Sequence, residues 1–329
     1  MHRFLLILFA LLIYVVLFSA QAKPRRGYVK FSESIEYAHL ALPASALQVN
    51  DLPVNWDWRN VNGTNFCSRT INQKNPAVCG SCWAFALTGA LTDRYIYMTG
   101  GRLQVQLAPQ NLLNFQEKIS GGTCNGGDPV KGYHFIHKYG ITDDTCTPYK
   151  GLNWVHGFEV ADMVEKHDVS THQCYSCDWK GSCGFLPGSS FNIYGVDGFG
   201  VVLGEAEMMA EIYNRGPIAC SINSDAEKFD SYRGGIIHNV SEKENKVTDH
   251  VVVVAGYGVD PATGMKFWVG RNSYGGQWGE GAGGGWFRLQ RGVNALGMEA
   301  NECAWAVPKS EHVARAISQW KESVAGVNV

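Results

Sequence analysis

The chain has 329 residues, of which 45% are hydrophobic and 18% are charged, and its formal net charge is −2. A chain of this length and composition can bury a sizeable core and form two subdomains. The balanced charge and the lack of a basic run exclude an electrostatic reason for binding nucleic acid or a charged membrane surface.

The N-terminus is typical of a secretory signal peptide. His2 and Arg3 precede an apolar run over residues 4–18, and Ala20-Gln21-Ala22 has the small-x-small pattern of a cleavage site. The run is too short for a comfortable transmembrane helix. We therefore predict a signal peptide over residues 1–22 and no membrane span after its removal, with a retained signal anchor as the alternative.

The secretory pathway is oxidising, so the ten cysteines are candidates for disulfide bonds rather than for zinc sites. Two sequons, Asn62-Gly63-Thr64 and Asn239-Val240-Ser241, predict glycosylation in the same pathway. Residues 23–51 have mixed composition, no sustained period and no cysteine. We predict that they form a short pro-segment, with a flexible arm of the mature protein as the alternative.

Helical patterns dominate the next part of the chain. Residues 83–100 predict a helix, and residues 107–113 predict a second, short helix that Pro109 opens near its first turn. Residues 130–139 predict a third helix, which Gly140 closes.

His134 and His137 lie on the third predicted helix at i, i+3 spacing, which fits a metal pair. No third ligand is near them in the sequence, so we interpret them as surface histidines. We accordingly predict neither a metal nor a cofactor.

A cysteine-rich insert separates the helices from a strand-rich part. Residues 146–183 hold four cysteines without a clear period, which predicts a segment stapled by disulfides. Beyond Asn192 the pattern predicts a short helix over residues 205–214 and several strands between glycine-rich turns. The predicted strands cover residues 218–222, 251–257, 267–271 and 286–289.

This order predicts an α+β protein with a mainly helical domain over residues 52–191 and a strand-rich domain over residues 192–308. A cleft between the two is the expected place for a site. Residues 309–329 have apolar residues at helical spacing, so we predict a C-terminal helical tail that docks on its own domain.

The segment Cys79-Gly80-Ser81-Cys82-Trp83 places a thiol at the start of the first predicted helix. Free amides and the dipole of a helix N-terminus favour a thiolate, and a nearby imidazolium favours it further. We therefore take Cys82 as a candidate nucleophile. Taken alone, the motif also fits half of a structural disulfide, a redox Cys-x-x-Cys or a pair of zinc ligands.

A cysteine nucleophile needs a base and a group that orients the base. His250 directly precedes a predicted strand, and Asn272 follows the next one. The Asn272 carbonyl can accept a hydrogen bond from the imidazole and fix its tautomer, and Trp278 can screen that bond from water. Taken separately, His250 also fits a core histidine and Asn272 a turn asparagine.

Together these motifs resemble the papain-like cysteine peptidases, and the resemblance covers about Leu52 to Val307. It implies a helical left domain and a β-barrel-like right domain with the active-site cleft between them. The separation of Cys82 and His250 exceeds the roughly 130–150 residues typical of the family, and the stapled insert accounts for the excess.

The resemblance also implies roles for further residues. Gln73 would stabilise the oxyanion together with the Cys82 amide. Gly126 and Gly127 would form the wall along which substrates pair their backbone, because a side chain there would block the peptide. Lys74 and Trp278 complete the residues that we expect to contact substrate.

Besides the candidate nucleophile Cys82, the implied disulfides leave one cysteine unpaired. Phe115 stands where the family has another half-cystine, whose partner is also missing here. We interpret the remaining Cys67 as a buried apolar cysteine, with a free or intermolecular thiol as the alternative. The implied pairs are Cys79 with Cys124, Cys146 with Cys174, Cys177 with Cys183, and Cys220 with Cys303.

One carboxypeptidase subgroup of the family has a small insertion before the nucleophile, which Lys74-Asn75-Pro76 occupies here. In that subgroup a histidine binds the C-terminal carboxylate of the substrate. Lys74, at the matching position, attracts a carboxylate with different geometry and keeps its charge near pH 6.

Other positions depart from the family pattern. Residues 23–51 lack the cysteine that caps the thiol in the subgroup's pro-segment, so latency requires steric blocking. Tyr274 replaces a tryptophan next to the catalytic asparagine, and the loop over residues 281–285 is longer than in the family.

The sequence therefore predicts a cysteine-type peptidase that acts through a Cys82 thioester and a thiolate–imidazolium pair, with carboxypeptidase preference. The resemblance adds peptide or protein substrates, cystatin-like inhibitors, and a lysosomal or extracellular location. The alternatives are a papain-like endopeptidase, a thiol-disulfide oxidoreductase using Cys79 and Cys82, and a non-catalytic peptide-binding homologue.

Overall fold

The computed structural model describes residues 27–30, 51–115, 120–153, 174–187, 190–281 and 283–325. The predicted signal peptide over residues 1–22 lies outside the described residues. So does the predicted pro-segment, apart from residues 27–30.

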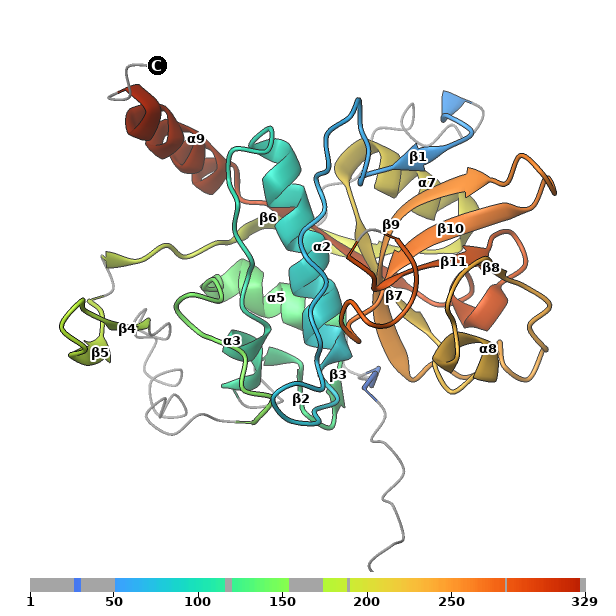
Figure 1. Cartoon of the computed structure of the whole chain (residues 1–329), viewed down its shortest axis with the longest axis horizontal. Helices are drawn as coiled ribbons and strands as arrows, with labels where there is room; N and C mark the ends of the chain where they lie inside the picture. The colour runs from blue at the N-terminus through green and yellow to red at the C-terminus, as the bar shows by residue number, and fades with distance from the viewer. Residues whose placement is uncertain are drawn as a thin grey trace, which may run out of the picture.

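Helix α2 (Cys82–Met98) lies at the centre of the molecule, with helices α3 (Pro109–Leu113) and α5 (Pro129–Tyr139) on one side and a large sheet on the other (Figure 1). The predicted helix over residues 83–100 is confirmed, and it begins at Cys82 itself. Because α2 is covered from both sides, most of its residues are buried, including the charged Asp93 and Arg94.

The ends of α5 follow local rules. The Asp128 carboxylate accepts a hydrogen bond from the Val130 amide at 2.8 Å, which satisfies one free donor of the first turn. Gly140 ends the helix with a φ of +82°, a conformation that favours glycine. Before α5, strands β2 (Gly122–Thr123) and β3 (Gly126–Gly127) form a small hairpin.

The large sheet has eight strands, in the order β6-β12-β7-β9-β10-β11-β8, with β1 paired to β9. All pairs are antiparallel except β11 with β8. The predicted strands are confirmed, with small shifts at their ends. The bounds are β1 (Trp56–Asp57), β6 (Val196–Val202), β7 (Ile218–Ile222), β8 (Ile236–Ile237), β9 (His250–Val259), β10 (Lys266–Arg271), β11 (Trp286–Gln290) and β12 (Cys303–Pro308).

Strands β6 and β12 were not among the predicted strands. β6 contains two glycines and β12 contains two alanines, residues with low strand propensity. The two strands pair because Gly200 leaves room for Trp305: a Cβ on Gly200 would lie 2.7 Å from the indole ring.

Shorter elements complete the described chain. The helix predicted over residues 205–214 is confirmed as α7. The remaining elements are α7 (Gly204–Arg215), α8 (Glu227–Asp230), the 3₁₀ helix η5 (Ala295–Gly297), and the hairpin of β4 (Tyr175–Cys177) with β5 (Cys183–Phe185).

Buried polar contacts fix α2 to the sheet. The Arg94 guanidinium lies 2.8 Å from Glu211 of α7, and it also donates to the carbonyls of Pro217 and Ala306 at 2.8 and 2.9 Å. A buried charge is tolerated only when it is paired and hydrogen-bonded in this way. The helix that carries Cys82 therefore has a fixed position relative to the strands that carry His250.

The C-terminal helix α9 (Ser310–Ala325) docks through its first half. Val313 is buried, and the Gly195 amide donates to Nδ1 of His312 at 2.9 Å. The second half is exposed and extends away from the body (Figure 1). In this half, Trp320 of the predicted apolar stripe packs on the Arg102 guanidinium, which lies 5.0 Å from the centroid of the Trp320 ring, so the predicted docking extends beyond the first half.

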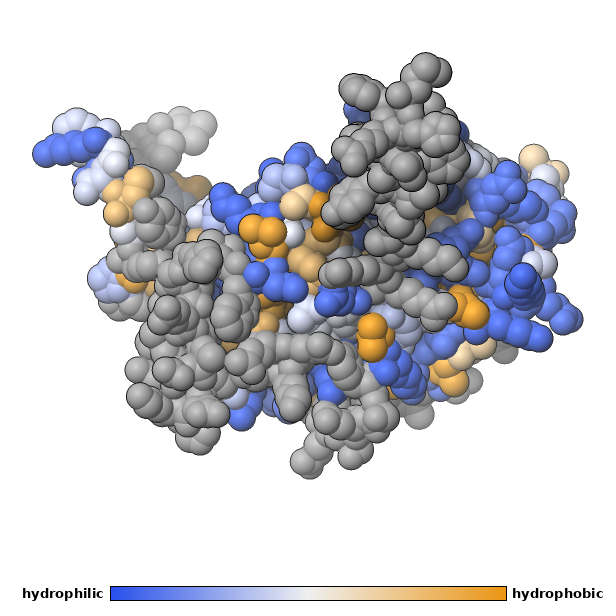
Figure 2. Space-filling model, turned by 90° about the horizontal axis from the view of Figure 1, so that it is seen from below, coloured by the Kyte–Doolittle hydropathy of each residue, from blue (hydrophilic) through white to orange (hydrophobic). Residues whose placement is uncertain are grey.

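Figure 2 shows apolar residues scattered among hydrophilic ones over the described part of the face seen from below. None of the helices within the described residues combines the length and the apolarity that a membrane crossing requires.

Candidate active site

Cys82 is the first residue of α2 and is fully buried. The backbone amides of Val251 and Trp83 lie close enough to its sulfur to lower the pKa of the thiol, against the larger effect of burial. Val251 directly follows His250, so these contacts bring the start of α2 to the start of β9. The helix start and the strand start that were predicted to carry a nucleophile and a base therefore meet.

His250 is held by Asn272. Nε2 of the imidazole lies 2.7 Å from Oδ1 of Asn272, and the same oxygen accepts a hydrogen bond from the Ser273 amide at 2.8 Å. Because this oxygen is an acceptor, the neutral imidazole carries its proton on Nε2. Nδ1 is then the nitrogen available for exchanging a proton with a thiol.

Aromatic rings enclose the His250–Asn272 pair. The Tyr274 ring centroid lies 5.0 Å from that of His250, and Phe229 lies 6.1 Å away. Trp278 packs behind them, 5.9 Å from Tyr274 and 5.0 Å from Phe229. Tyr274 thus contacts the imidazole directly, and Trp278 forms a second layer of the screen.

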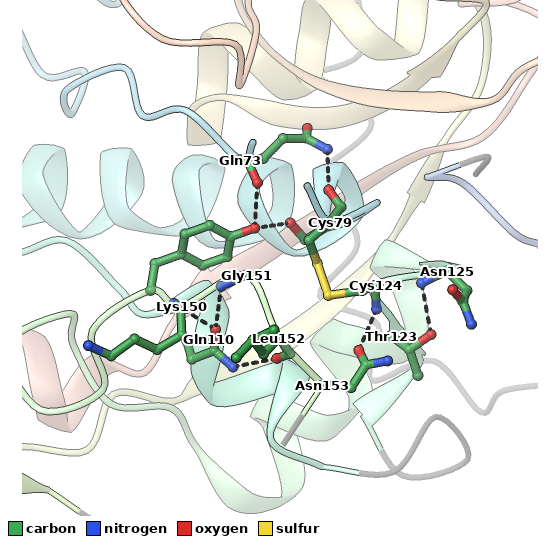
Figure 3. The surroundings of a disulfide bond; sticks show 12 residues. Gln73, Cys79, Gln110, Thr123, Cys124, Asn125, Lys150, Gly151, Leu152 and Asn153 are labelled. Carbon is green, nitrogen blue, oxygen red and sulfur yellow. Dashed lines mark hydrogen bonds between the residues drawn. A yellow bond between two sulfur atoms is a disulfide. The ribbon is translucent and has the colours of Figure 1, made fainter. Parts of the chain in front are cut away.

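Gln73 is fixed at both ends of its side chain. Nε2 donates to the Cys79 carbonyl at 2.9 Å (Figure 3). Oε1 accepts from the Ser273 hydroxyl at 2.6 Å. The Gln73 backbone amide also donates to the Ser273 carbonyl at 2.9 Å. An amide nitrogen carries two hydrogens, so one of them is left for an oxyanion near Cys82.

Residues 27–30 lie across the predicted substrate wall. The amides of Gly27 and Tyr28 both donate to the Asp249 carbonyl, at 2.9 and 3.1 Å. The Val29 amide donates to the Gly127 carbonyl at 3.1 Å, and the Gly127 amide donates back to the Gly27 carbonyl at 3.3 Å. The segment therefore pairs with Gly127 as a parallel strand.

Gly27 passes directly over the thiol. A Cβ at this position would lie 2.4 Å from the Cys82 sulfur. Only glycine allows so close an approach of the backbone. The described piece of the predicted pro-segment therefore covers the candidate nucleophile.

Burial sets the protonation of the pair in this covered form. It raises the pKa of Cys82 to about 12 and lowers the pKa of His250 to about 4. For His250, the hydrogen bond to Asn272 opposes the shift and the charge of Lys74 adds to it. Both groups are therefore neutral in this covered form, unlike the thiolate–imidazolium pair expected from the sequence, because both side chains are buried.

Lys74 is exposed and lies beside these groups. Its Nζ atom is 4.0 Å from the centroid of the Tyr274 ring, the ring that packs on His250. A cation over an aromatic face is attracted by the quadrupole of the ring. The ammonium is thereby held on the imidazole side of the site.

The structure contains the disulfides Cys79–Cys124 (Figure 3), Cys146–Cys174 and Cys220–Cys303, which are pairings that the resemblance implies. Cys183 is also disulfide-bonded. Its expected partner, Cys177, is its register partner in the β4–β5 hairpin, but the Cys177 side chain lies outside those described.

Cys67 carries a free thiol and is partly buried. Burial raises its pKa well above the usual value, so it is a poor nucleophile. The predicted glycosylation residues Asn62 and Asn239 are both exposed. Neither the burial of Cys67 nor the exposure of the two asparagines places these residues in the site around Cys82.

Sequence reasoning missed several residues of the site. Ser273 binds both Gln73 and Asn272, Phe229 borders His250, and Tyr149 donates to the Gln73 carbonyl at 2.6 Å. The sequence offered a signal only for Ser273, which follows Asn272 directly. Phe229 and Tyr149 come from segments whose approach to the site depends on the fold.

Comparisons with known proteins agree with this geometry. The family model described as "Papain family cysteine protease" matches residues 52–307. A protein of Onchocerca volvulus named "Cathepsin Z" is 38% identical over 285 residues, which cover 83% of this chain and 84% of that protein. Cathepsin Z, also called cathepsin X, is the carboxypeptidase subgroup that has the small insertion before the nucleophile.

Solved structures share the fold. A digestive procathepsin L 3 of Tenebrio molitor larval midgut matches with a TM-score of 0.60 and 22% identity, over 86% of this chain and 76% of that one. The bromelain protease of Ananas comosus, solved in complex with the E64 inhibitor, matches with a TM-score of 0.56 and 24% identity, over 78% of this chain and 99% of that one.

Proposed function

The chain belongs to the papain family of cysteine proteases, and on this premise we propose that it removes residues from the C-termini of peptides through a thioester on Cys82. It is a cysteine-type peptidase that acts on peptide substrates. The carboxypeptidase preference rests on one observation, the position of the Lys74 ammonium over the Tyr274 ring beside His250.

That position suits a carboxylate clamp. The imidazole protonates the leaving amine, so the residue released by the reaction lies on the imidazole side of the scissile bond. When that residue is the last of the substrate, its carboxylate is one residue away from the reacting carbonyl. The positive charge of a lysine on this side attracts that carboxylate.

The proposed reaction begins with attack of the Cys82 thiolate on the scissile carbonyl. The oxyanion accepts hydrogen bonds from the Gln73 side chain and the Cys82 amide. His250 gives its proton to the leaving amine, and the C–N bond breaks to leave a thioester. Water then attacks the thioester with His250 as base, while Asn272 keeps the imidazole oriented.

We propose that residues 23–51 are the pro-segment and keep the enzyme latent. Gly27 covers the sulfur, and the segment occupies the hydrogen-bonding groups of Gly127, which would bind substrate. Removing it would rehydrate Cys82 and His250 and restore their ability to form an ion pair. Steric blocking would thus replace the pro-segment cysteine that this chain lacks.

The oxidoreductase alternative is not favoured. Cys79 is bonded to Cys124 and is buried, so it has no thiol that could alternate with Cys82. For the mature enzyme we propose a lysosomal or extracellular location and inhibition by cystatin-like proteins, both by likeness to cathepsins.

The test compares matched peptides with a free or an amidated C-terminus on the processed enzyme. We expect amidation to lower kcat/KM by about tenfold or more. A change of this size corresponds to the free energy that a hydrogen bond to a charged group contributes. Lys74→Met should remove this preference. Lys266→Met, at an exposed lysine at the start of β10, serves as the control.

Equal rates on the two peptides would mean an endopeptidase without a chain-end clamp. No cleavage of either peptide, together with no reaction with an epoxide label, would mean a peptide-binding homologue without activity.

A further inference from the structure

Tyr149 lies at the junction of the two segments that form the proposed oxyanion hole. Its hydroxyl donates to the backbone carbonyl of Gln73 at 2.6 Å and lies 2.8 Å from the Ser81 hydroxyl. Gln73 carries the side-chain donor, and Ser81 directly precedes Cys82, which carries the backbone donor. One oxygen atom therefore joins both donors of the hole.

The direction of each hydrogen bond follows from counting protons. A phenol has one proton, and a carbonyl can only accept, so the Tyr149 proton goes to Gln73. Ser81 must then donate to Tyr149. Burial raises the pKa of Tyr149 to about 12, so the phenol stays protonated over the working range of the enzyme.

The Ser81 hydroxyl does not cap the helix that it precedes. Serine at a helix N-cap normally accepts a hydrogen bond from an amide of the first turn. Ser81 is the N-cap of α2 and makes no such bond. The first amides of α2 thereby remain available to the thiol and to an oxyanion, while Ser81 serves Tyr149 instead.

Tyr149 is held in place through its ring and through the segment that follows it. The ring packs against Phe85, one turn into α2, with ring centroids 4.7 Å apart. Buried Gln110 of α3 accepts from the amides of Lys150 and Gly151 and donates to the Leu152 carbonyl (Figure 3). The segment after Tyr149 thus has little freedom to move away from the site.

The same segment packs closely against the loop between Gln73 and Cys79. A Cβ on Gly151 would lie 2.9 Å from the Ala77 carbonyl. Tyr149 and Gly151 therefore support both the start of this loop and its middle.

We propose that Tyr149 is a positioning residue of the oxyanion hole, which sets the distance between the Gln73 side chain and the Cys82 amide by binding Gln73 and Ser81 at once. The proposal rests on the peptidase function proposed above. Oxyanion donors act only when they are preorganised at the developing charge, so loosening their frame slows the chemical step without weakening substrate binding.

The test is Tyr149→Phe, which removes only the hydroxyl. On an internally quenched peptide that the wild-type enzyme cleaves, we expect kcat to fall about tenfold and KM to change less than about twofold. A peptide aldehyde, whose adduct with the thiol carries an oxyanion-like oxygen, should bind about tenfold more weakly. The rate of alkylation by iodoacetamide, which expels iodide and develops no oxyanion, should stay unchanged.

Tyr133→Phe is the matched control. The Tyr133 hydroxyl also donates to a backbone carbonyl of the helical half, that of Leu87 in α2, at 3.0 Å, but it lies away from the hole. This variant should lose comparable thermal stability and keep kcat. Ser81→Ala keeps the Tyr149–Gln73 bond and should lower kcat less than Tyr149→Phe does. If Tyr149→Phe does not fold, Ser81→Ala replaces it as the test of the proposal.

An unchanged kcat and aldehyde affinity in both Tyr149→Phe and Ser81→Ala would overturn the proposal. Equal kcat losses in Tyr149→Phe and Tyr133→Phe would overturn it too, because the effect would then be one of general stability. A wild-type enzyme that cleaves no peptide would instead refute the proposed function.

Discussion

The carboxylate of Asp93 lies 2.9 Å from the guanidinium of Arg271, and both side chains are almost completely buried. Asp93 belongs to α2, the helix that Cys82 begins, and Arg271 ends β10 immediately before Asn272. The Ser68 amide and hydroxyl complete the shell of the carboxylate, each at 2.7 Å. This ion pair therefore links the two elements that carry the nucleophile and the orienting asparagine.

Asp93→Asn is expected to destabilise the protein by about 3–5 kcal/mol, because it leaves the Arg271 charge buried without a counter-charge. Urea unfolding monitored by tryptophan fluorescence measures the change. Arg69→Gln, which breaks the exposed pair with Asp144, is the control and should cost about 0–1 kcal/mol. A similar small change in both variants would show that the buried pair does not hold α2 to the sheet.

Cys82→Ala and, separately, His250→Ala are expected to abolish peptide hydrolysis by the processed enzyme, because each removes a participant in acyl transfer. Activity on a fluorogenic peptide measures the loss, and thermal melting checks the fold. Cys67→Ala is the control, since this free thiol lies away from the site and should be dispensable. Retained activity in either processed variant would refute the assignment.

The main site residues could be predicted because each stands at the end of an element with a clear pattern. Cys82 begins a helix, His250 begins an apolar strand, and Asn272 follows the next strand. Tyr149 and Phe229 could not be predicted, because their contacts depend on which distant segments meet. The neutral state of Cys82 and His250 could not be predicted either, since it follows from how completely the fold buries the two side chains.

The fold was predictable to a similar extent. Periodicity located α2, α5, α7 and the apolar strands β7, β9, β10 and β11, because their residues favour one structure locally. Strands β6 and β12 lack that local preference and form through pairing with each other and with β7. The second half of α9 is more exposed than its apolar stripe predicts, although Trp320 of that stripe packs on Arg102.

Lys74→Met should shift the alkaline limb of the pH profile to higher pH. The limb reflects loss of the imidazolium proton from His250. Burial lowers the pKa of this group and the Lys74 charge lowers it further, so removing that charge raises the pKa and keeps the imidazolium to higher pH. The profile of kcat/KM should be measured on an amidated peptide, so that the proposed carboxylate clamp plays no part. A shift to lower pH, or none, would mean that Lys74 does not influence the imidazole.

Gly27→Ala in the full-length precursor should weaken its latency. The new Cβ would lie 2.4 Å from the Cys82 sulfur, so the pro-segment backbone must move away from the thiol. We expect the precursor to react faster with an epoxide label than the wild-type precursor does, because the nucleophile is less covered. Once the pro-segment is removed, the two enzymes are identical and should have equal kcat/KM. Gly184→Ala is the control, since its Cβ would meet no neighbour. Equal labelling of the Gly27→Ala and wild-type precursors would mean that Gly27 does not shield Cys82 in solution.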